Sequence, residues 1–343
     1  MLHTLFAGMN DVDQSTGMRA FEDIVAEPGD VLISEGKAPP GLFVLLQGEV
    51  SISAKGVALG KAGAGDLIGE MALFDHGASS ASVFAETPVK TLFLTRQAYD
   101  GLRDVVHPVA AAIEKATLHL QSLRLRQAGD RIAARSAGTP FQANRPTERF
   151  FSAVTALFGR GGRFSADRVD TLGALSRSPL FEGASNEALG QIADVFQAQA
   201  FGPGAFVCTE GERGDSMYLL DEGEIDVLVS TRDDRVEPLA TLRPGAMFGA
   251  ISLVEDRPRM CSCVAKGRVV VNALNREGYA ALVDHPWYAG SLFRRAMIQM
   301  FAGQLAEAND QLAVLESQSL AEQTLTHLRK AAIGMTRSSE RIH

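Results

Sequence analysis

The chain has 343 residues, of which 46% are hydrophobic and 22% charged, with a formal net charge of −8 at pH 7. This length allows two domains with separate cores, and the acidic balance argues against a broad nucleic-acid-binding surface. The longest apolar runs fall short of the roughly 18 residues that a membrane-spanning helix needs. The first residues, MLHTLFAGMNDVDQ, lack the basic and apolar regions of a secretory signal. We therefore expect a cytoplasmic protein without DNA or membrane contact.

A long internal repeat organises the chain. One copy reads PGDVLISEGKAPPGLFVLLQGEVSI from Pro28, and the other reads PGAFVCTEGERGDSMYLLDEGEIDV from Pro203. Further matching pairs follow in the same order: Gly36 with Gly211, Gly48 with Gly223, Gly65 with Gly245, Gly69 with Gly249, and His107-Pro108 with His285-Pro286. Self-similarity over such a long period indicates a duplicated structural unit.

Each copy begins as a series of short β-strands. In the first copy the apolar positions that indicate strands are Val31 and Ile33, Phe43 and Leu45, and Val50 and Ile52. Turns rich in Gly, Pro and Asp separate these segments. Many short strands with such turns predict a small sandwich or jelly-roll barrel. The expected fold class is therefore mainly β with α: two barrels, each followed by a long helix.

The helix after the first barrel begins at Pro108, a residue that suits a first helical position. Its apolar seam steps by four and three through Val109, Ile113, Ala116, Leu120 and Leu123. Packing against its own barrel and pairing with another helix both explain such a seam.

A linker is expected at residues 127–170, which are rich in Arg, Gly, Ser and Thr. Within it, the segment ERFFSAVTALFGRGGR predicts a short amphipathic helix with one apolar face, formed by Phe150, Phe151, Val154, Leu157 and Phe158. Such a helix can lie on a membrane surface, but docking onto a barrel is the favoured interpretation. The expected domains are residues 1–126 and 171–320, with a C-terminal tail at 321–343.

The second copy ends in a longer helix that opens at Pro286. Its seam runs through Ile298, Phe301, Leu305, Ala308, Leu312 and Leu315. Because this helix outruns one small barrel, pairing with a second copy of the chain is favoured, which predicts a homodimer through the C-terminal helix. The alternative is that the linker segment around Phe150 folds back and covers the seam.

Three cysteines offer little chemistry in the sequence. Cys261 and Cys263 lie two apart on an expected strand, and three is an odd number, so a disulfide framework is not expected. The favoured interpretation is that the cysteines are small buried packing residues of a protein in a reduced compartment.

The seven histidines are scattered, so no metal site is expected. The sequence contains no catalytic motif that we recognise, and a non-enzymatic protein is expected.

Two glycine-led loops occupy matching places in the repeats. The first reads IGEMALFDHGASS from Ile68 to Ser80, and the second reads FGAISLVEDRPR from Phe248 to Arg259. The first loop has Glu70 where the second has Ala250, and Ser79 where the second has Arg259. Each loop therefore lacks one charged residue that the other keeps.

Together, the barrel, the glycine spacing and the following helix resemble the cyclic nucleotide-binding domain family. The resemblance covers roughly residues 5–125 and 178–315, and its most specific element is the phosphate-binding cassette, a stretch close to F-G-E-L-A-L followed by P-R-A-A-T. In that family the cassette Glu binds the ribose hydroxyl, the Arg binds the cyclic phosphate, and nearby backbone N–H groups complete the phosphate site. The resemblance implies a cyclic nucleotide ligand for this chain.

The two cassettes differ in what they could bind. The first keeps Gly69 and Glu70 but lacks the arginine, so its carboxylate would repel a phosphate. The second keeps Arg259 and should be the better anion site, because a charge-assisted Arg–phosphate contact contributes about 1.5–3 kcal/mol. Alternatively, Arg259 pairs with Glu255 or Asp256 and only holds the loop. The candidate ligand-binding residues are Gly69, Glu70, Met71, Ser79 and Ser80 in the first cassette, and Phe248, Gly249, Ala250, Ile251, Arg259 and Met260 in the second.

Two functions remain open at this point. The favoured one is a regulatory protein that senses a cyclic nucleotide, needs no cofactor, and relays the signal to an unnamed protein partner. The alternative is a ligand-free scaffold built from degenerate binding domains. A transcription factor is not expected, because SLAEQTLTHLRKAAIGMTRSSERIH, the sequence after the second helix seam, is too short for a DNA-reading helix-turn-helix domain.

Overall fold

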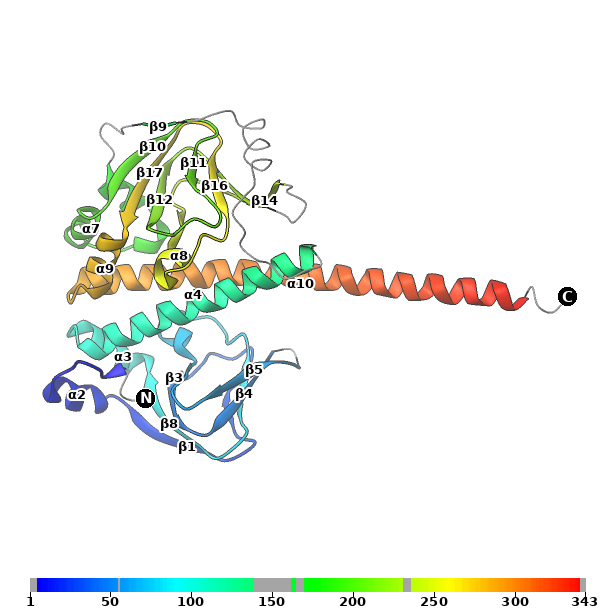
Figure 1. The fold of residues 1–343 in the computed structure, drawn as a ribbon. Helices are drawn as coiled ribbons and strands as arrows, with labels where there is room; N and C mark the ends of the chain where they lie inside the picture. The colour runs from blue at the N-terminus through cyan, green and yellow to red at the C-terminus, as the bar shows by residue number, and fades with distance from the viewer. Residues whose placement is uncertain (1–4, 55, 138–161, 165–169, 231–235, 340–343) are drawn as a thin grey trace.

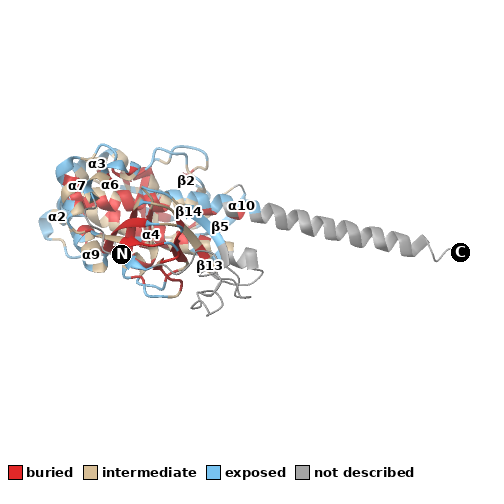
Figure 2. Ribbon diagram, turned by 90° about the horizontal axis from the view of Figure 1, so that it is seen from above, coloured by how far each residue is buried: buried red, intermediate tan, exposed pale blue. Residues whose placement is uncertain are grey.

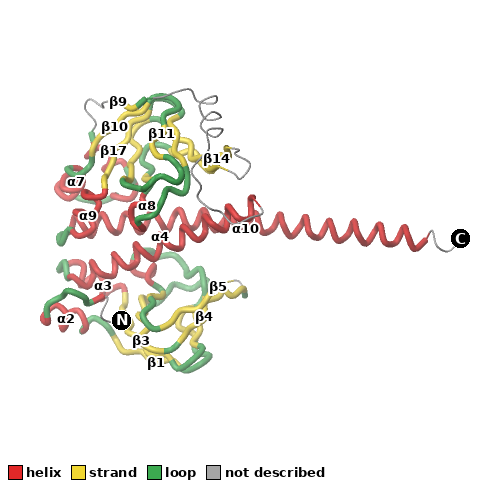
Figure 3. Tube along the Cα trace, in the orientation of Figure 1, coloured by secondary structure: helices red, strands yellow, loops and turns green. Residues whose placement is uncertain are grey.

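The computed structural model describes residues 5–54, 56–137, 162–164, 170–230 and 236–339. Two antiparallel β units lie on opposite sides of a pair of long helices (Figure 1). The prediction of two β units, each followed by a long helix, is confirmed. The tube view in Figure 3 shows the two helices running between the strands of the two units.

The first unit contains two four-stranded sheets, ordered β1-β8-β3-β6 and β2-β7-β4-β5. Its strands are β1 (Glu22–Ala26), β2 (Val31–Ile33), β3 (Gly41–Gln47), β4 (Glu49–Ala54), β5 (Val57–Gly63), β6 (Leu67–Ile68), β7 (Ser82–Ala85) and β8 (Val89–Thr95). Its helices are α2 (Asp11–Met18), η1 (Glu70–Leu73), α3 (Arg96–Asp104) and α4 (Pro108–Ala137). The strands expected from alternating apolar residues are thus present as β2, β3 and β4.

The second unit repeats this plan with one added edge strand, in the orders β15-β12-β17-β10-β9 and β11-β16-β13-β14. Its strands are β9 (Arg163–Phe164), β10 (Gln197–Phe201), β11 (Phe206–Cys208), β12 (Ser216–Glu222), β13 (Ile225–Ser230), β14 (Val236–Leu242), β15 (Met247–Phe248), β16 (Ser262–Ala265) and β17 (Val269–Asn275). Its helices are α6 (Thr171–Arg177), η2 (Pro179–Phe181), α7 (Asn186–Ala193), α8 (Ala250–Glu255), α9 (Arg276–Asp284) and α10 (Tyr288–Ser339).

Several expected boundaries differ from the observed ones. Helix α4 continues past residue 126 to Ala137, so the start of the expected linker is helical. Strand β9 also falls inside the expected linker, where it pairs with β10. Helix α10 continues past residue 320 to Ser339 and extends beyond both β units (Figure 1). The amphipathic segment around Phe150 lies outside the described residues and stays a prediction.

Helices α4 and α10 pack side by side and run in the same direction (Figure 1). The largest apolar core joins them to both β units, and buried residues gather around α4 (Figure 2). In the seam of α10, Ile298, Phe301, Ala308 and Leu312 are buried within the chain, and Leu305 packs against the same core. The expectation that this part of the seam is free to pair with a second chain is wrong, because α4, the helix of the other repeat, packs on α10 within the same chain. The side chain of Leu315 lies outside the described residues, and the homodimer stays a prediction.

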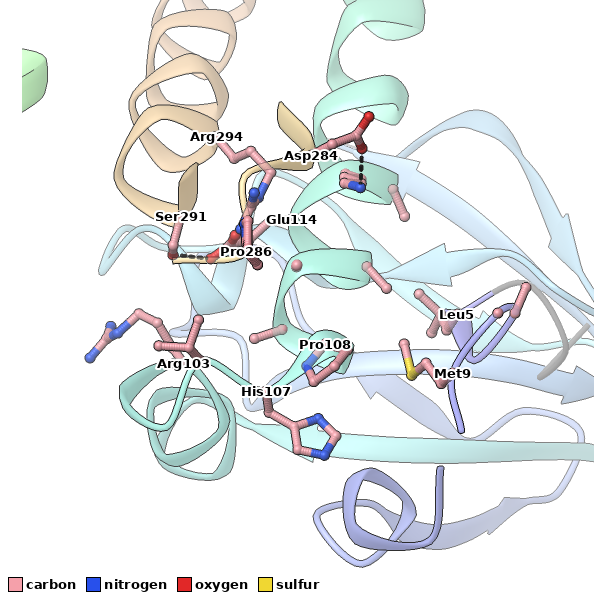
Figure 4. A pocket seen from close by; sticks show the side chains of 18 of the residues that line it. Leu5, Met9, Arg103, His107, Pro108, Glu114, Asp284, Pro286, Ser291 and Arg294 are labelled. Atoms are coloured by element: carbon pink, nitrogen blue, oxygen red, sulfur yellow. Dashed lines mark hydrogen bonds and ion pairs between the residues drawn. The ribbon is translucent and has the colours of Figure 1, made fainter. Parts of the chain in front are cut away.

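A buried charged cluster links the two helices. Glu114 of α4 is fully buried and accepts hydrogen bonds from Ser291 Oγ at 2.6 Å and Arg294 Nε at 2.7 Å (Figure 4). It also accepts a hydrogen bond from Tyr99 Oη at 2.8 Å. Arg294 also donates to the carbonyl of Val283 at 2.8 Å. Burial raises the pKa of Tyr99 far above its usual value, and the Glu114 carboxylate raises it further, so the phenol stays a neutral donor. The cluster therefore aligns the start of α10 on α4.

The packing of α10 on α4 can be tested with Phe301, which is fully buried. We expect Phe301→Ala to lower the free energy of unfolding by about 3–5 kcal/mol, because it opens a cavity in the shared core. Its sedimentation coefficient should equal that of the unaltered chain. A dimer that dissociates in this variant would contradict the intramolecular seam.

The buried pair can be compared with a surface pair one residue away. Glu114→Ala leaves the charge of Arg294 buried without a partner, and we expect a loss of about 3–5 kcal/mol in urea unfolding. Lys115, which pairs with Asp284 at 2.5 Å, is 41% exposed in its side chain. Lys115→Ala should change the stability by no more than about 1 kcal/mol. An equal loss of unfolding free energy in the two variants would contradict the conclusion that the buried Glu114–Arg294 pair holds the two helices together.

Candidate functional site

The two cassettes adopt closely similar backbone conformations. Each short strand, β6 or β15, leads into a glycine with positive φ, 72° at Gly69 and 76° at Gly249, and then into η1 or α8. A Cβ at Gly69 would lie 2.5 Å from the Gly41 carbonyl oxygen, and one at Gly249 would lie 2.7 Å from Arg259 Nη1. Glycine is therefore required at both turns.

In the first cassette, the carboxylate of Glu70 already has partners on α4. Glu70 is only 2% exposed, and its Oε1 accepts from Gln121 Nε2 at 2.9 Å and Arg124 Nη1 at 2.5 Å. The cation that balances this carboxylate thus comes from the helix. This ion pair couples the cassette turn to α4.

The remainder of the first cassette offers no cation for an anionic ligand. Ser79, at the place of the arginine, donates from its hydroxyl to the Ala81 carbonyl at 2.8 Å, and Ser80 is exposed. Met71 is half-buried and packs on the large core. Inside the barrel, the rings of Phe43 and Phe93 lie 4.7 Å apart in an apolar cluster. A phosphate there would lose its hydration without gaining a charged partner.

In the second cassette, Arg259 turns inward. It is 4% exposed, and its guanidinium donates to the carbonyls of Gly249 at 2.5 Å and Ser216 at 2.6 Å. The same group lies 5.8 Å from the ring centre of Tyr218. Among the residues that the structure describes, Arg259 forms no ion pair with a carboxylate. The two carbonyls orient the guanidinium, but they do not neutralise its charge.

The proposed alternative partners of Arg259 are engaged elsewhere. Glu255 pairs with Arg126 of α4, in a contact where both side chains are largely buried. Asp256 pairs with Arg276 at 2.9 Å and Arg213 at 3.5 Å. The interpretation in which Glu255 or Asp256 pairs with Arg259 is therefore wrong.

The remaining residues of the second cassette shape its surroundings. Phe248 is buried and stacks on Tyr218, with ring centres 5.1 Å apart. Ala250 is buried and brings no side-chain oxygen, while Ile251 packs on the large core. Met260 is half-buried, and its methyl carbon reaches α4, where a Cβ on Gly129 would lie 2.6 Å away.

Helix α4 contacts both cassettes, which the sequence did not indicate. Arg124 reaches Glu70 and Arg126 reaches Glu255. Residues two apart on a helix point roughly 200° from one another, so these arginines reach opposite sides of α4. The sequence feature that could have indicated these contacts is the arginine pair Arg124 and Arg126 in the stretch QSLRLRQ, which follows the apolar seam of this helix.

Other parts of the described chain add little to the site. A cavity of about 640 Å³ lies at the start of α4 and α10 (Figure 4), and its lining includes no residue of either cassette, although Leu67 directly precedes the first. Four of its charged lining groups form pairs, Glu114 with Arg294 and Lys115 with Asp284.

Within the described ranges, no group of three His, Cys, Asp or Glu side chains could hold a metal ion. In the same ranges, no helix combines the length and apolarity needed to cross a membrane.

Comparison with known proteins places the repeats in one family. The model for the cyclic nucleotide-binding domain matches residues 24–104 and 198–285. The cAMP-dependent protein kinase regulatory subunit of Yarrowia lipolytica is 23% identical over 280 residues, which cover 81% of this chain and 58% of that protein. The cGMP-dependent protein kinase egl-4 of Caenorhabditis briggsae is 23% identical over 75% of this chain and 27% of its own length. The chain thus spans little more than half of the first relative and about a quarter of the second.

Solved structures of the same kind are similar to this chain. The regulatory domain of Toxoplasma gondii PKA in complex with cAMP is 19% identical, covers 82% of this chain and 88% of its own, and has a TM-score of 0.32. A cyclic nucleotide-binding domain from Methylobacillus flagellatus is 26% identical over 41% of this chain and 79% of its own, with a TM-score of 0.38. The family model, by its match to residues 24–104 and 198–285, assigns both repeats to the cyclic nucleotide-binding domain family, and the chain carries the two domains in tandem.

Proposed function

We propose that the protein is a non-enzymatic regulatory protein that binds one cyclic nucleotide at the second cassette and transmits binding through α4. The observation that carries this proposal is Arg259, a buried guanidinium that is oriented by two carbonyls and lacks a carboxylate partner among the described residues. A buried cation without an anion is unfavourable, so an incoming phosphate supplies the missing charge. Arg259 also presents the planar donor pair that suits phosphate oxygens.

The first cassette has a different role in this proposal. Its carboxylate is balanced by Arg124, and its barrel interior is apolar, so a cyclic phosphate has no partner there. We assign it to holding α4 in place. The expected stoichiometry is therefore one nucleotide per chain.

The second cassette should bind more weakly than a site with both anchors. Ala250 stands where a ribose-binding carboxylate is expected, and its methyl group cannot accept a hydrogen bond. A missing charge-assisted hydrogen bond of about 1.5–3 kcal/mol lowers affinity by about 10- to 150-fold. The same loss weakens discrimination at the ribose hydroxyl.

The contacts of α8 suggest how binding reaches the rest of the chain. Helix α8 begins after Gly249 and ends at Glu255, which pairs with Arg126 of α4. A shift of the cassette around a bound phosphate would therefore act on α4, which packs on α10. The similar Yarrowia protein is a kinase regulatory subunit, which supports a protein as the recipient of the signal.

The ligand-free scaffold remains the second candidate. The first unit favours this candidate, because the polar side chains of its cassette, Glu70 and Ser79, already form hydrogen bonds within the chain. If the second unit also fails to take a nucleotide, the chain acts only as a rigid pair of domains.

Isothermal titration with cAMP and cGMP tests the assignment of the site. We expect Arg259→Ala to weaken nucleotide binding at least tenfold, because the phosphate loses its charged partner. Arg259→Lys should retain part of the affinity, since it keeps the charge but not the planar donor pair. Glu70→Gln is the matched control and should leave the affinity unchanged. Loss of binding in Glu70→Gln alone would reverse the assignment, and no heat with either nucleotide at millimolar concentration would favour the scaffold.

Hydrogen exchange of α4 tests the proposed transmission. With nucleotide bound to the unaltered chain, we expect changed exchange in the α4 peptide that contains Arg124 and Arg126. Glu255→Gln breaks the ion pair to Arg126 and should keep nucleotide binding while removing this change. Asp256→Asn, on the neighbouring residue that pairs with Arg276, is the control and should retain it. An unaltered response of α4 in Glu255→Gln would exclude this route.

A further inference from the structure

All three cysteines of the chain lie in the second unit, within or against one buried cluster that also contains Phe248 of the second cassette. Cys208 lies on β11 and Cys263 on β16, and the two are direct partners across this antiparallel pair. Both are buried, whereas Cys261, just before β16, is half-buried. The expectation of small buried side chains holds for Cys208 and Cys263, but the sequence did not indicate that the thiols meet.

The thiols contact one another and lie close to Arg259. Cys208 and Cys263 belong to one buried cluster, and Cys261 packs against it. The neighbouring Cys263 thiol lowers the pKa of Cys208 in spite of its burial, and the positive charge of Arg259 adds to the effect. The pKa of Cys263 is raised. The cluster therefore contains one thiol that ionises more readily beside one that stays protonated.

The sister unit shows that packing alone does not require sulfur at these positions. The repeat places Ile33, Val83 and Ala81 where the second unit has Cys208, Cys263 and Cys261. Ile33 and Val83 are likewise direct partners, between β2 and β7. The same barrel position is thus filled by aliphatic side chains in one copy and by thiols in the other.

We propose that Cys208 and Cys263 are a reversible thiol-modification site that forms a disulfide on reaction with a hydroperoxide. Directly opposed residues of antiparallel strands have Cα atoms about 4.5–5.5 Å apart, within the roughly 4.4–6.8 Å that disulfides span. Unlike two cysteines on one strand, these two residues face each other across neighbouring strands, which brings the pair within reach of a bond. The proposal stands on the strand pairing and does not depend on nucleotide binding.

The reaction has two steps. The Cys208 sulfur attacks one oxygen of hydrogen peroxide, the O–O bond breaks, and the thiol proton leaves with the other oxygen as water, which gives a sulfenic acid. The Cys263 sulfur then attacks the Cys208 sulfur, the S–O bond breaks, and the Cys263 proton leaves with the hydroxyl as a second water. Two thiols are oxidised and one peroxide is reduced. A dithiol reductant reverses the bond by thiol–disulfide exchange.

This site is placed to act on the second cassette. A Cys208–Cys263 bond would fix β11 to β16, and β16 begins shortly after Arg259. It would also remove the thiol that lies near the Arg259 charge. The redox state of the pair would then affect the position of the guanidinium.

The full-length protein can be tested directly. The reduced chain is treated with hydrogen peroxide, quenched, and alkylated with N-ethylmaleimide in denaturant before peptide mass spectrometry. We expect alkylated thiols to fall from three to one, a linked peptide pair to contain Cys208 and Cys263, and dithiothreitol to restore all three. Cys261→Ala, as in the sister unit, should still form the bond.

Matched variants keep the test decisive. Cys208→Ile and Cys263→Val copy the sister unit, and each should abolish the linked peptides while keeping the fold by circular dichroism. Three alkylated thiols after peroxide would overturn the proposal. Oxidation confined to Cys261, or a bond between two chains, would also overturn it.

Discussion

The packing of α4 against α10 is the interaction on which the rest of the arrangement depends. Each helix covers an apolar face of the other, and the fully buried pair of Glu114 and Arg294 ties them together. Because the helices come from different repeats, their packing joins the duplicated units. The β units then lie on opposite sides of the pair, and both cassettes contact one helix, α4 (Figure 1).

Charge balance separates the two cassettes. Glu70 is neutralised by Arg124, whereas Arg259 is held by uncharged carbonyls and keeps its positive charge. An anion would have to displace an existing ion pair in the first cassette, but it would complete an unbalanced site in the second. The two loops, which look like halves of one site in the sequence, therefore have different electrostatic roles.

The sequence predicted the features that depend on local pattern. The duplication, strands β2 to β4, the helix after Pro108 and both glycine turns follow from spacing and residue type, and the family comparison confirms the resemblance. Long-range partners could not be predicted in this way. Nothing near Ile298 or Phe301 reveals that they are buried within the chain, and the binding of Glu70 by Gln121 and Arg124 spans two elements. The meeting of Cys208 with Cys263 likewise depends on strand pairing.

The central claim is that only the second cassette can take an anionic nucleotide. Native mass spectrometry of the intact chain with excess cAMP measures this most directly, because it counts the molecules bound per chain. The account predicts saturation at one nucleotide per chain. Saturation at two would contradict the role given to the Glu70–Arg124 pair, and a chain that stays empty would contradict the role given to Arg259.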